Sequence, residues 1–131
     1  MNIEKKLQEI RIACKIADWF SVEQHVDYDF DISLGVLFAE GRIVFYNGNI
    51  LEFTESITPD RVKYRYHYMT ADRDLIFRYD NVPHHSEIPT FPNHKHVPEK
   101  IVESNPVNIK EVVEEIIELL PLPGHLIITA R

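Results

Sequence analysis

The chain has 131 residues, of which 44% are hydrophobic and 27% are charged. This length suffices for one domain with its own core and is short for two, so we expect a single domain over residues 1–131. The apolar runs fall far short of the roughly 20 residues that cross a bilayer. Charged residues interrupt the N-terminal segment, which argues against a secretory signal. The single cysteine, Cys14, excludes an internal disulfide and suits a reducing compartment. Composition therefore predicts a cytoplasmic protein without membrane contact.

The net charge of −7 is unevenly distributed along the chain. Residues 61–100 hold seven Lys and Arg against five Asp and Glu, and they form its only basic part. Five of the seven histidines also lie there, at positions 67, 84, 85, 94 and 96. A basic patch on an acidic protein can bind a polyanion, although a solvated surface with uneven charge gives the same pattern. Because histidine titrates near neutral pH, we expect any acid–base or metal chemistry in this segment.

The first half of the chain predicts a helix followed by strands. Apolar residues recur at spacings of three and four through residues 3–20, with charged residues between them, as in an amphipathic helix. Residues 26–32 alternate apolar and acidic side chains, which predicts a half-buried strand, and residues 34–46 form a longer strand candidate. Asn47-Gly48 favours a tight turn, so the strands on either side of it should pair as a hairpin.

Two further alternating segments predict a second hairpin. The tyrosines at 64, 66 and 68 alternate with basic residues, and residues 75–80 alternate in the same way. If the turn is centred on residues 72 and 73, His67 lies opposite Arg78 and Arg65 lies opposite Asp80. The register thus predicts a polar quartet on one face of the sheet, made of Arg65, His67, Arg78 and Asp80.

The last part of the chain predicts a loop and a helix. Prolines at 83, 89, 92 and 98, with Pro106 at the boundary, remove helical and strand periodicity over residues 81–105, which indicates a long Pro/His-rich loop. Asn108 can cap a helix over residues 109–120, and residues 125–130 favour an edge strand. We therefore expect an α+β fold, an antiparallel β-meander of about five strands with N-terminal and C-terminal helices packed on one face.

Several common kinds of active site do not fit this sequence. The four glycines lie too far apart for a phosphate-binding loop, and no serine stands in a nucleophile-elbow sequence. Cys14 belongs to the apolar stripe of the first helix, where a thiol is usually buried and inert. Nucleotide-dependent phosphoryl transfer and catalysis by a Ser or Cys nucleophile are therefore not expected.

The histidines fit a metal-independent endoribonuclease, which needs no cofactor. One imidazole or tyrosine would take a proton from an RNA 2′-hydroxyl, a cation would stabilise the charge that develops on the phosphoryl group, and a second group would protonate the leaving oxygen. The candidate catalytic residues are His67, Arg65, Arg78, His85, His94 and His96.

Two other interpretations of the histidines remain open. His84, His85, His94 and His96 could surround one ion, because a His-x-His pattern on extended chain puts both rings on one side. Their spacing matches no zinc signature, so we expect no bound metal. Alternatively, these polar groups only hydrogen-bond to loop carbonyls that lack sheet partners.

The same segment also resembles a known family. The pattern consists of YRYHY at 64–68, LIFRYDN at 75–81, PHH at 83–85, EI at 87–88, TFP at 90–92 and HKHV at 94–97. It resembles the TumE family, small proteins regarded as the toxin halves of prokaryotic toxin–antitoxin pairs. GRIVFYNG at 41–48 and LEF at 51–53 also resemble that family's hairpin. The resemblance covers about residues 36–117, leaves out the first 30 residues, and departs at Val82, where a small residue is expected.

This resemblance implies a toxin that inhibits growth when free. It also implies a cognate antitoxin encoded beside it, commonly a helix-turn-helix protein. Resemblance and histidine chemistry together favour an endoribonuclease acting on RNA, although no catalytic residue is carried over from the family. The alternatives are a non-enzymatic binding module that acts through its sheet and a metal-binding protein built on the histidines. A homodimer is compatible with each of these.

Overall fold

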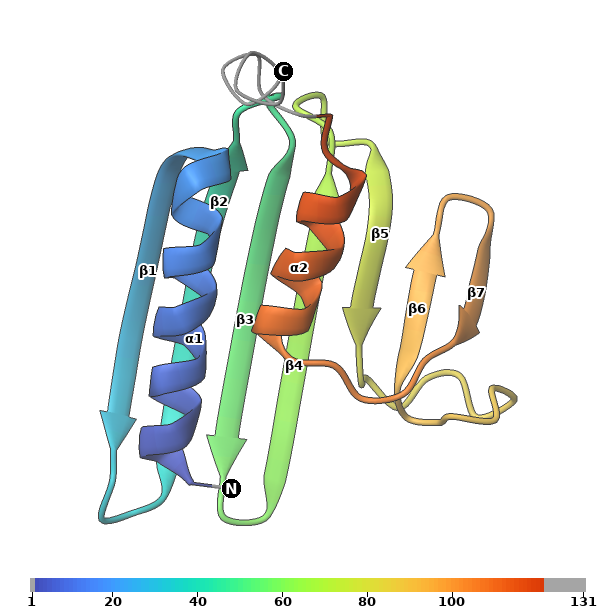
Figure 1. Cartoon of the computed structure of the whole chain (residues 1–131). Helices are drawn as coiled ribbons and strands as arrows, with labels where there is room; N and C mark the ends of the chain where they lie inside the picture. The colour runs from blue at the N-terminus through green and yellow to red at the C-terminus, as the bar shows by residue number, and fades with distance from the viewer. Residues whose placement is uncertain (1, 122–131) are drawn as a thin grey trace.

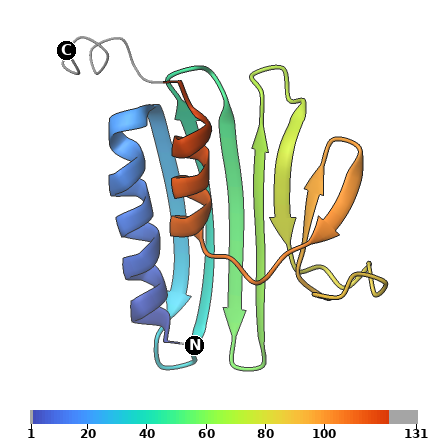
Figure 2. The same cartoon turned by 45° about the vertical axis from the view of Figure 1, so that its right-hand side comes forward.

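The computed structural model describes residues 2–121, which form one seven-stranded antiparallel sheet and two α-helices. The strands pair in chain order. Both helices lie on the same face of the sheet (Figures 1 and 2). The elements are α1 (Ile3–Ala17), the 3₁₀ turn η1 (Asp18–Phe20), β1 (Ser21–Asp31), β2 (Val36–Phe45), β3 (Ile50–Thr58), β4 (Arg61–Met69), β5 (Leu75–Asp80), β6 (His94–Val97), β7 (Lys100–Glu103) and α2 (Ile109–Leu119).

The α+β class, the antiparallel meander and the position of the two helices are confirmed, but the expected number of about five strands is wrong. β6 and β7 form an extra hairpin inside the segment predicted as a loop over residues 81–105. Each of these strands has four residues, which is too short for an alternation to show among the surrounding prolines. The hairpin thus divides the predicted loop, and irregular chain precedes it at residues 81–93 and follows it at 104–108. The edge strand expected at residues 125–130 lies outside the described residues.

Both predicted hairpins form, and the register predicted for the second is confirmed. Gly48 has a φ of 90°, the left-handed conformation that the turn between β2 and β3 requires. In the second hairpin His67 pairs with Arg78 and Arg65 pairs with Asp80. Within residues 2–121 no helix is long and apolar enough to cross a membrane.

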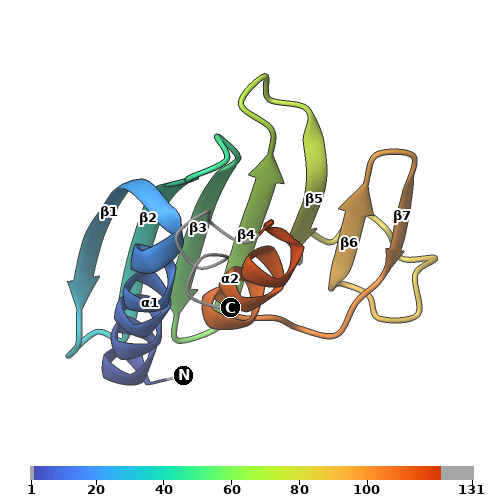
Figure 3. The same cartoon turned by 45° about the horizontal axis from the view of Figure 1, so that its top comes forward.

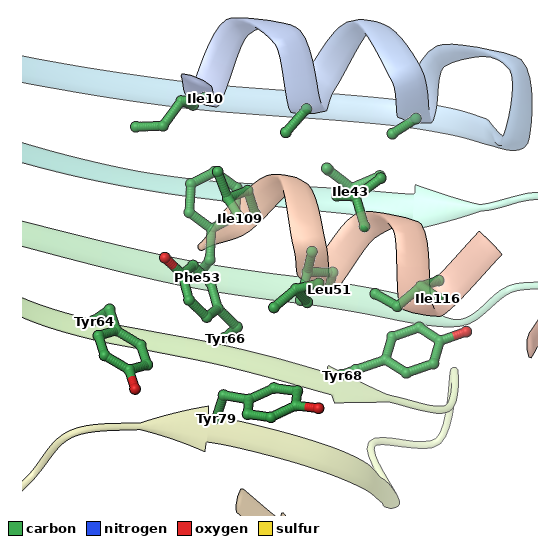
Figure 4. Close-up of a cluster of buried hydrophobic side chains, with 14 of the residues drawn as sticks. Ile10, Ile43, Leu51, Phe53, Tyr64, Tyr66, Tyr68, Tyr79, Ile109 and Ile116 are labelled. Carbon is green, nitrogen blue, oxygen red and sulfur yellow. The ribbon is translucent and has the colours of Figure 1, made fainter. Parts of the chain in front are cut away.

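The core lies between the two helices and the sheet. Figure 4 shows aliphatic side chains of the helices above a layer of aromatic rings that project from β3, β4 and β5. Tyr66, at the centre of this layer, is fully buried and stacks on Tyr64 with the ring centroids 5.4 Å apart. The alternation of tyrosines along β4 therefore serves the core.

The buried side of α1 differs from the apolar stripe predicted for it. Leu7 and Cys14 are only half-buried, whereas the fully buried positions are Ile3, Lys6, Ile10, Ala13 and Ala17. Lys6 is buried because its Nζ lies 2.5 Å from Oε1 of Glu55 on β3 and 2.7 Å from Oε1 of Glu9. The hydroxyl of Tyr66 donates to the same Glu55 oxygen at 2.6 Å. A charged network thus joins α1 to the sheet.

α2 begins where the sequence predicts and is tied to the sheet by one carboxylate. The Asn108 side chain accepts from the backbone N–H of Glu111, and the Glu111 side chain accepts from the backbone N–H of Asn108, which forms a capping box. Further along the helix, Glu115 accepts from the Tyr79 hydroxyl at 2.6 Å and from Lys95 Nζ at 2.9 Å. These contacts connect α2 to β5 and β6.

Candidate active site

The face of the sheet turned away from the helices carries the predicted polar residues. Both helices lie on the other side of the strands in Figure 3. Directly opposite residues in an antiparallel pair lie on the same face. His67 lies opposite Arg78, and Arg78 lies opposite His96, so these three side chains form one row across β4, β5 and β6. Tyr66 and Phe77 lie on the helix-covered face and are buried. The predicted orientation of this hairpin is therefore confirmed.

A second row runs beside the first. Arg65 lies opposite Asp80, and Asp80 lies opposite His94. The fold thus gathers five of the six predicted site residues in two neighbouring rows. The sixth, His85, reaches the same place from the irregular segment after β5, because its ring contacts those of His94 and His96.

Asp80 connects these groups and was not among the candidates drawn from the sequence. It is 3% exposed. It accepts from Arg78 Nε at 3.1 Å and from the backbone N–H of Val82 at 3.0 Å, and its Oδ1 lies 2.9 Å from His94 Nε2. A buried carboxylate requires such partners. The predicted register placed Asp80 in the polar quartet, and this placement could have identified it as a site residue.

His85, His94 and His96 form a compact group, called the His cluster below. Their ring centroids are 4.8 to 5.6 Å apart, with the planes close to perpendicular. One ring nitrogen from each lies within 4.8 Å of the other two. His84, which the sequence also offered as a ligand, is exposed and outside this group.

The three rings differ in their access to solvent. His94 is 2% exposed, with Nδ1 2.8 Å from the carbonyl oxygen of Pro92. Because a carbonyl can only accept, this nitrogen carries the hydrogen. His94 is thus buried beside Asp80 and lies out of reach of a large substrate. His85 keeps 26% of its side chain exposed, so it is the ring most open to a ligand.

Burial and neighbouring cations keep two of the imidazoles neutral. Burial lowers the pKa of His67, and the charges of Arg65 and Arg78 lower it further. Burial and the Arg78 charge lower the pKa of His96 to about 4, and Arg78 Nη2 lies 3.1 Å from His96 Nε2. Both rings are therefore neutral at pH 7 and hold an unprotonated nitrogen. Nδ1 of His67 is buried and has no hydrogen-bond partner among the described residues.

A basic groove leads along β4 to this site. Arg61, Lys63 and Arg65 alternate along the uncovered face and are all exposed. They line a groove of about 380 Å³ together with the half-exposed Phe38 of β2 and Val82 after β5.

The opposite side of the same face is acidic. Asp27, Asp29 and Asp31 are exposed on β1, and their partners on β2 include Glu40. A polyanion is therefore repelled at β1 and attracted at β4.

Comparison with known proteins agrees with this architecture. The model of the family described as toxin TumE matches residues 14–120. This match confirms the resemblance seen in the sequence and begins earlier in the chain, within α1. No curated protein and no solved structure matches the chain. Because the family match spans most of the sequence, from α1 to the end of α2, the chain belongs to the TumE family of toxins.

Proposed function

We propose that this toxin acts as an endoribonuclease. Family membership makes it the toxin component of a toxin–antitoxin pair and implies a cognate antitoxin. The proposal adds that the antitoxin is a helix-turn-helix protein, that RNA is the substrate, and that cleavage takes place over Arg78.

The observation that carries this proposal is the row of His67, Arg78 and His96 on the uncovered face. Arg78 on β5 lies between His67 on β4 and His96 on β6. Neighbouring strands are roughly 4.8 Å apart, so the two outer backbones are about 10 Å apart. A phosphodiester bound to the guanidinium would therefore have a histidine on either side. A positioned cation with an acid and a base is the arrangement that phosphodiester transfer requires.

The reaction can be written with the chain's own side chains. His67, neutral at pH 7, takes the proton of the ribose 2′-hydroxyl while the 2′-oxygen attacks the adjacent phosphorus. Arg78 and Arg65 offset the negative charge that develops on the phosphoryl oxygens. The bond to the 5′-oxygen breaks, and this oxygen takes a proton from His85, the more exposed histidine beyond Arg78, because neutral His96 has no acidic proton to give. The products are a 2′,3′-cyclic phosphate and a 5′-hydroxyl, and no metal ion takes part in this step.

The basic groove supports RNA as the substrate. A cationic groove that follows the phosphate backbone, with aromatic rings beside it for bases, is typical of proteins that bind single strands. Arg61, Lys63 and Arg65 supply the cations, and the exposed ring of Phe38 supplies the aromatic surface.

His67→Ala tests the proposal. Removal of one acid or base lowers the rate by about 10²–10⁴, so expression of this variant without the antitoxin should no longer inhibit growth. The purified variant should cleave RNA slower by the same factor and keep its circular dichroism spectrum, because His67 lies outside the core. His84→Ala is the matched control, since His84 is exposed and outside the site; it should remain toxic.

The enzyme hypothesis fails if folded His67→Ala remains fully toxic, or if the wild type freed from its antitoxin degrades no RNA. A non-enzymatic module that blocks its target through the uncovered face would then explain the toxicity.

A further inference from the structure

The His cluster has dimensions that suit a metal ion. Three imidazole nitrogens bound tetrahedrally to one zinc ion lie roughly 3.4 Å apart, since each Zn–N distance is about 2.1 Å. The corresponding nitrogens of His85, His94 and His96 lie within 4.8 Å of one another. A movement of each ring by roughly 1 Å or less closes this difference. Such a movement is easiest for His85, which lies in the irregular segment between β5 and β6.

The cluster also has the supporting contacts that metal-binding histidines use. A ligating histidine usually donates its other ring N–H to a carbonyl or carboxylate, which fixes the tautomer. His94 donates Nδ1–H to the carbonyl of Pro92, so its Nε2 is the nitrogen available to an ion. His85 Nδ1 lies 3.4 Å from Glu87 Oε1, a looser contact with an exposed carboxylate. The Nε2 of His94 is thus prepared in the form that a metal requires.

Asp80 gives a further reason to expect a cation at this position. Its Oδ1 lies 2.9 Å from His94 Nε2, and its Oδ2 lies 3.5 Å from His96 Nε2. An ion bound to His94 Nε2 would therefore lie beside a buried carboxylate, whose negative charge favours a cation at this position. Asp80 also pairs with Arg78, which offsets part of the arginine charge beside the cluster.

We propose that His85, His94 and His96 bind one first-row transition-metal ion, with zinc as the preferred occupant and Asp80 beside it as a neighbouring or fourth ligand. Imidazole nitrogens suit zinc, copper, iron and nickel. Three histidines with an accessible fourth position form a common zinc environment. The proposal goes beyond the ribonuclease assignment and does not rest on it.

This inference replaces the expectation that the chain binds no metal. That expectation rested on the spacing of histidines along the sequence, whereas metal binding depends on the distances between their ring nitrogens in the folded chain. Strand β6 brings His94 and His96 to one face, and the preceding irregular segment returns His85 to them. With an ion bound, the ligating nitrogen of His85 is occupied, so the ion and a leaving-group proton compete for this ring.

The test is a titration of zinc into the full chain, prepared without an affinity tag and dialysed against chelator. Isothermal titration calorimetry in the absence of RNA should show one zinc per chain, and cobalt should give the visible absorption of a tetrahedral site. His85→Ala should weaken binding at least about tenfold, since even loss of a supporting contact costs 10–100-fold. His96→Ala is a second ligand variant with the same expected loss. His84→Ala, one residue away and outside the cluster, should bind as the wild type does.

The proposal is overturned if the wild type binds no zinc at one ion per chain, or if His85→Ala and His84→Ala bind it equally well. Circular dichroism of each variant shows whether it is folded. If His85→Ala does not fold, the zinc affinity of His96→Ala decides the question. Because no RNA is present, failure of this test leaves the ribonuclease proposal untouched, and loss of RNA cleavage leaves the metal site untouched.

Discussion

Replacement of Lys6 by Met should destabilise the protein strongly, because it leaves the charge of Glu55 without its cation. The side chains of Lys6 and Glu55 are 6% and 2% exposed. Removal of one partner from a buried ion pair costs about 3–5 kcal/mol, since the remaining charge keeps its desolvation penalty. A typical domain is stable by only about 5–15 kcal/mol, so this loss is a large part of the total. The hydrogen bond from Tyr66 remains, and Oε2 of Glu55 has no partner among the described residues.

The loss should depend on pH with a defined sign. Burial raises the pKa of Glu55 above its ordinary value of 4.5, and the charge of Lys6 offsets only part of that effect. Without Lys6 the pKa rises further. A carboxyl with a raised folded-state pKa favours folding at low pH, and this contribution is lost as the pH rises through that pKa. Lys6→Met should therefore lose more stability at pH 8 than at pH 5.

Urea unfolding of the wild type and Lys6→Met at both pH values measures these differences. Glu9→Gln is the control, because Glu9 is the more exposed partner of Lys6 and its loss should cost about 1 kcal/mol or less. The triple variant Lys6→Met, Glu55→Met, Tyr66→Phe removes the whole network and should regain most of the loss. Equal unfolding free energies for the wild type and Lys6→Met, or a loss that is the same at both pH values, would refute this account.

Two further predictions concern α2 and the basic groove. Asn108→Ala removes the capping box and should lower the unfolding free energy by about 1 kcal/mol in urea titrations. Asn105→Ala, in the exposed chain before the helix, should change this free energy by less than about 0.5 kcal/mol. Equal effects of the two variants would contradict the capping role of Asn108. Lys63→Ala, made in the inactive His67→Ala background, should reduce the slope of log K against log salt for single-stranded RNA by about 0.7. Lys5→Ala, on the far side of the molecule in α1, should leave that slope unchanged, and the groove would lose its assigned role if both variants behaved alike.

The sequence predicts the central hairpins well because two independent patterns agree there. Tyr64, Tyr66 and Tyr68 alternate with basic residues, the next strand alternates too, and the turn length sets one register. That register was enough to place His67 beside Arg78 and Arg65 beside Asp80. Asn108 was likewise recognisable, since a capping residue before an apolar stripe is a local signal.

The remaining features depend on contacts between distant residues. β6 and β7 are too short to show a period, and β6 joins the sheet by pairing with β5, a contact between separate segments. Lys6 lies between the apolar positions of the first helix, and its burial could not be predicted because it requires Glu55 from another element. The His cluster joins a ring from an irregular segment to two rings of β6. The spacing of residues along the sequence does not reveal such contacts.

The order of the strands has a consequence for how the protein folds. Each strand pairs with its neighbour in the chain, so the sheet can grow by short loop closures, which cost little entropy. The contact between α1 and α2 is different, because it joins the two ends of the described chain. This closure brings together the most distant segments and so carries the largest entropic cost. The face that bears His67 and Arg78 should therefore be assembled while the sheet forms, and the hydrophobic layer on the other side should be sealed last.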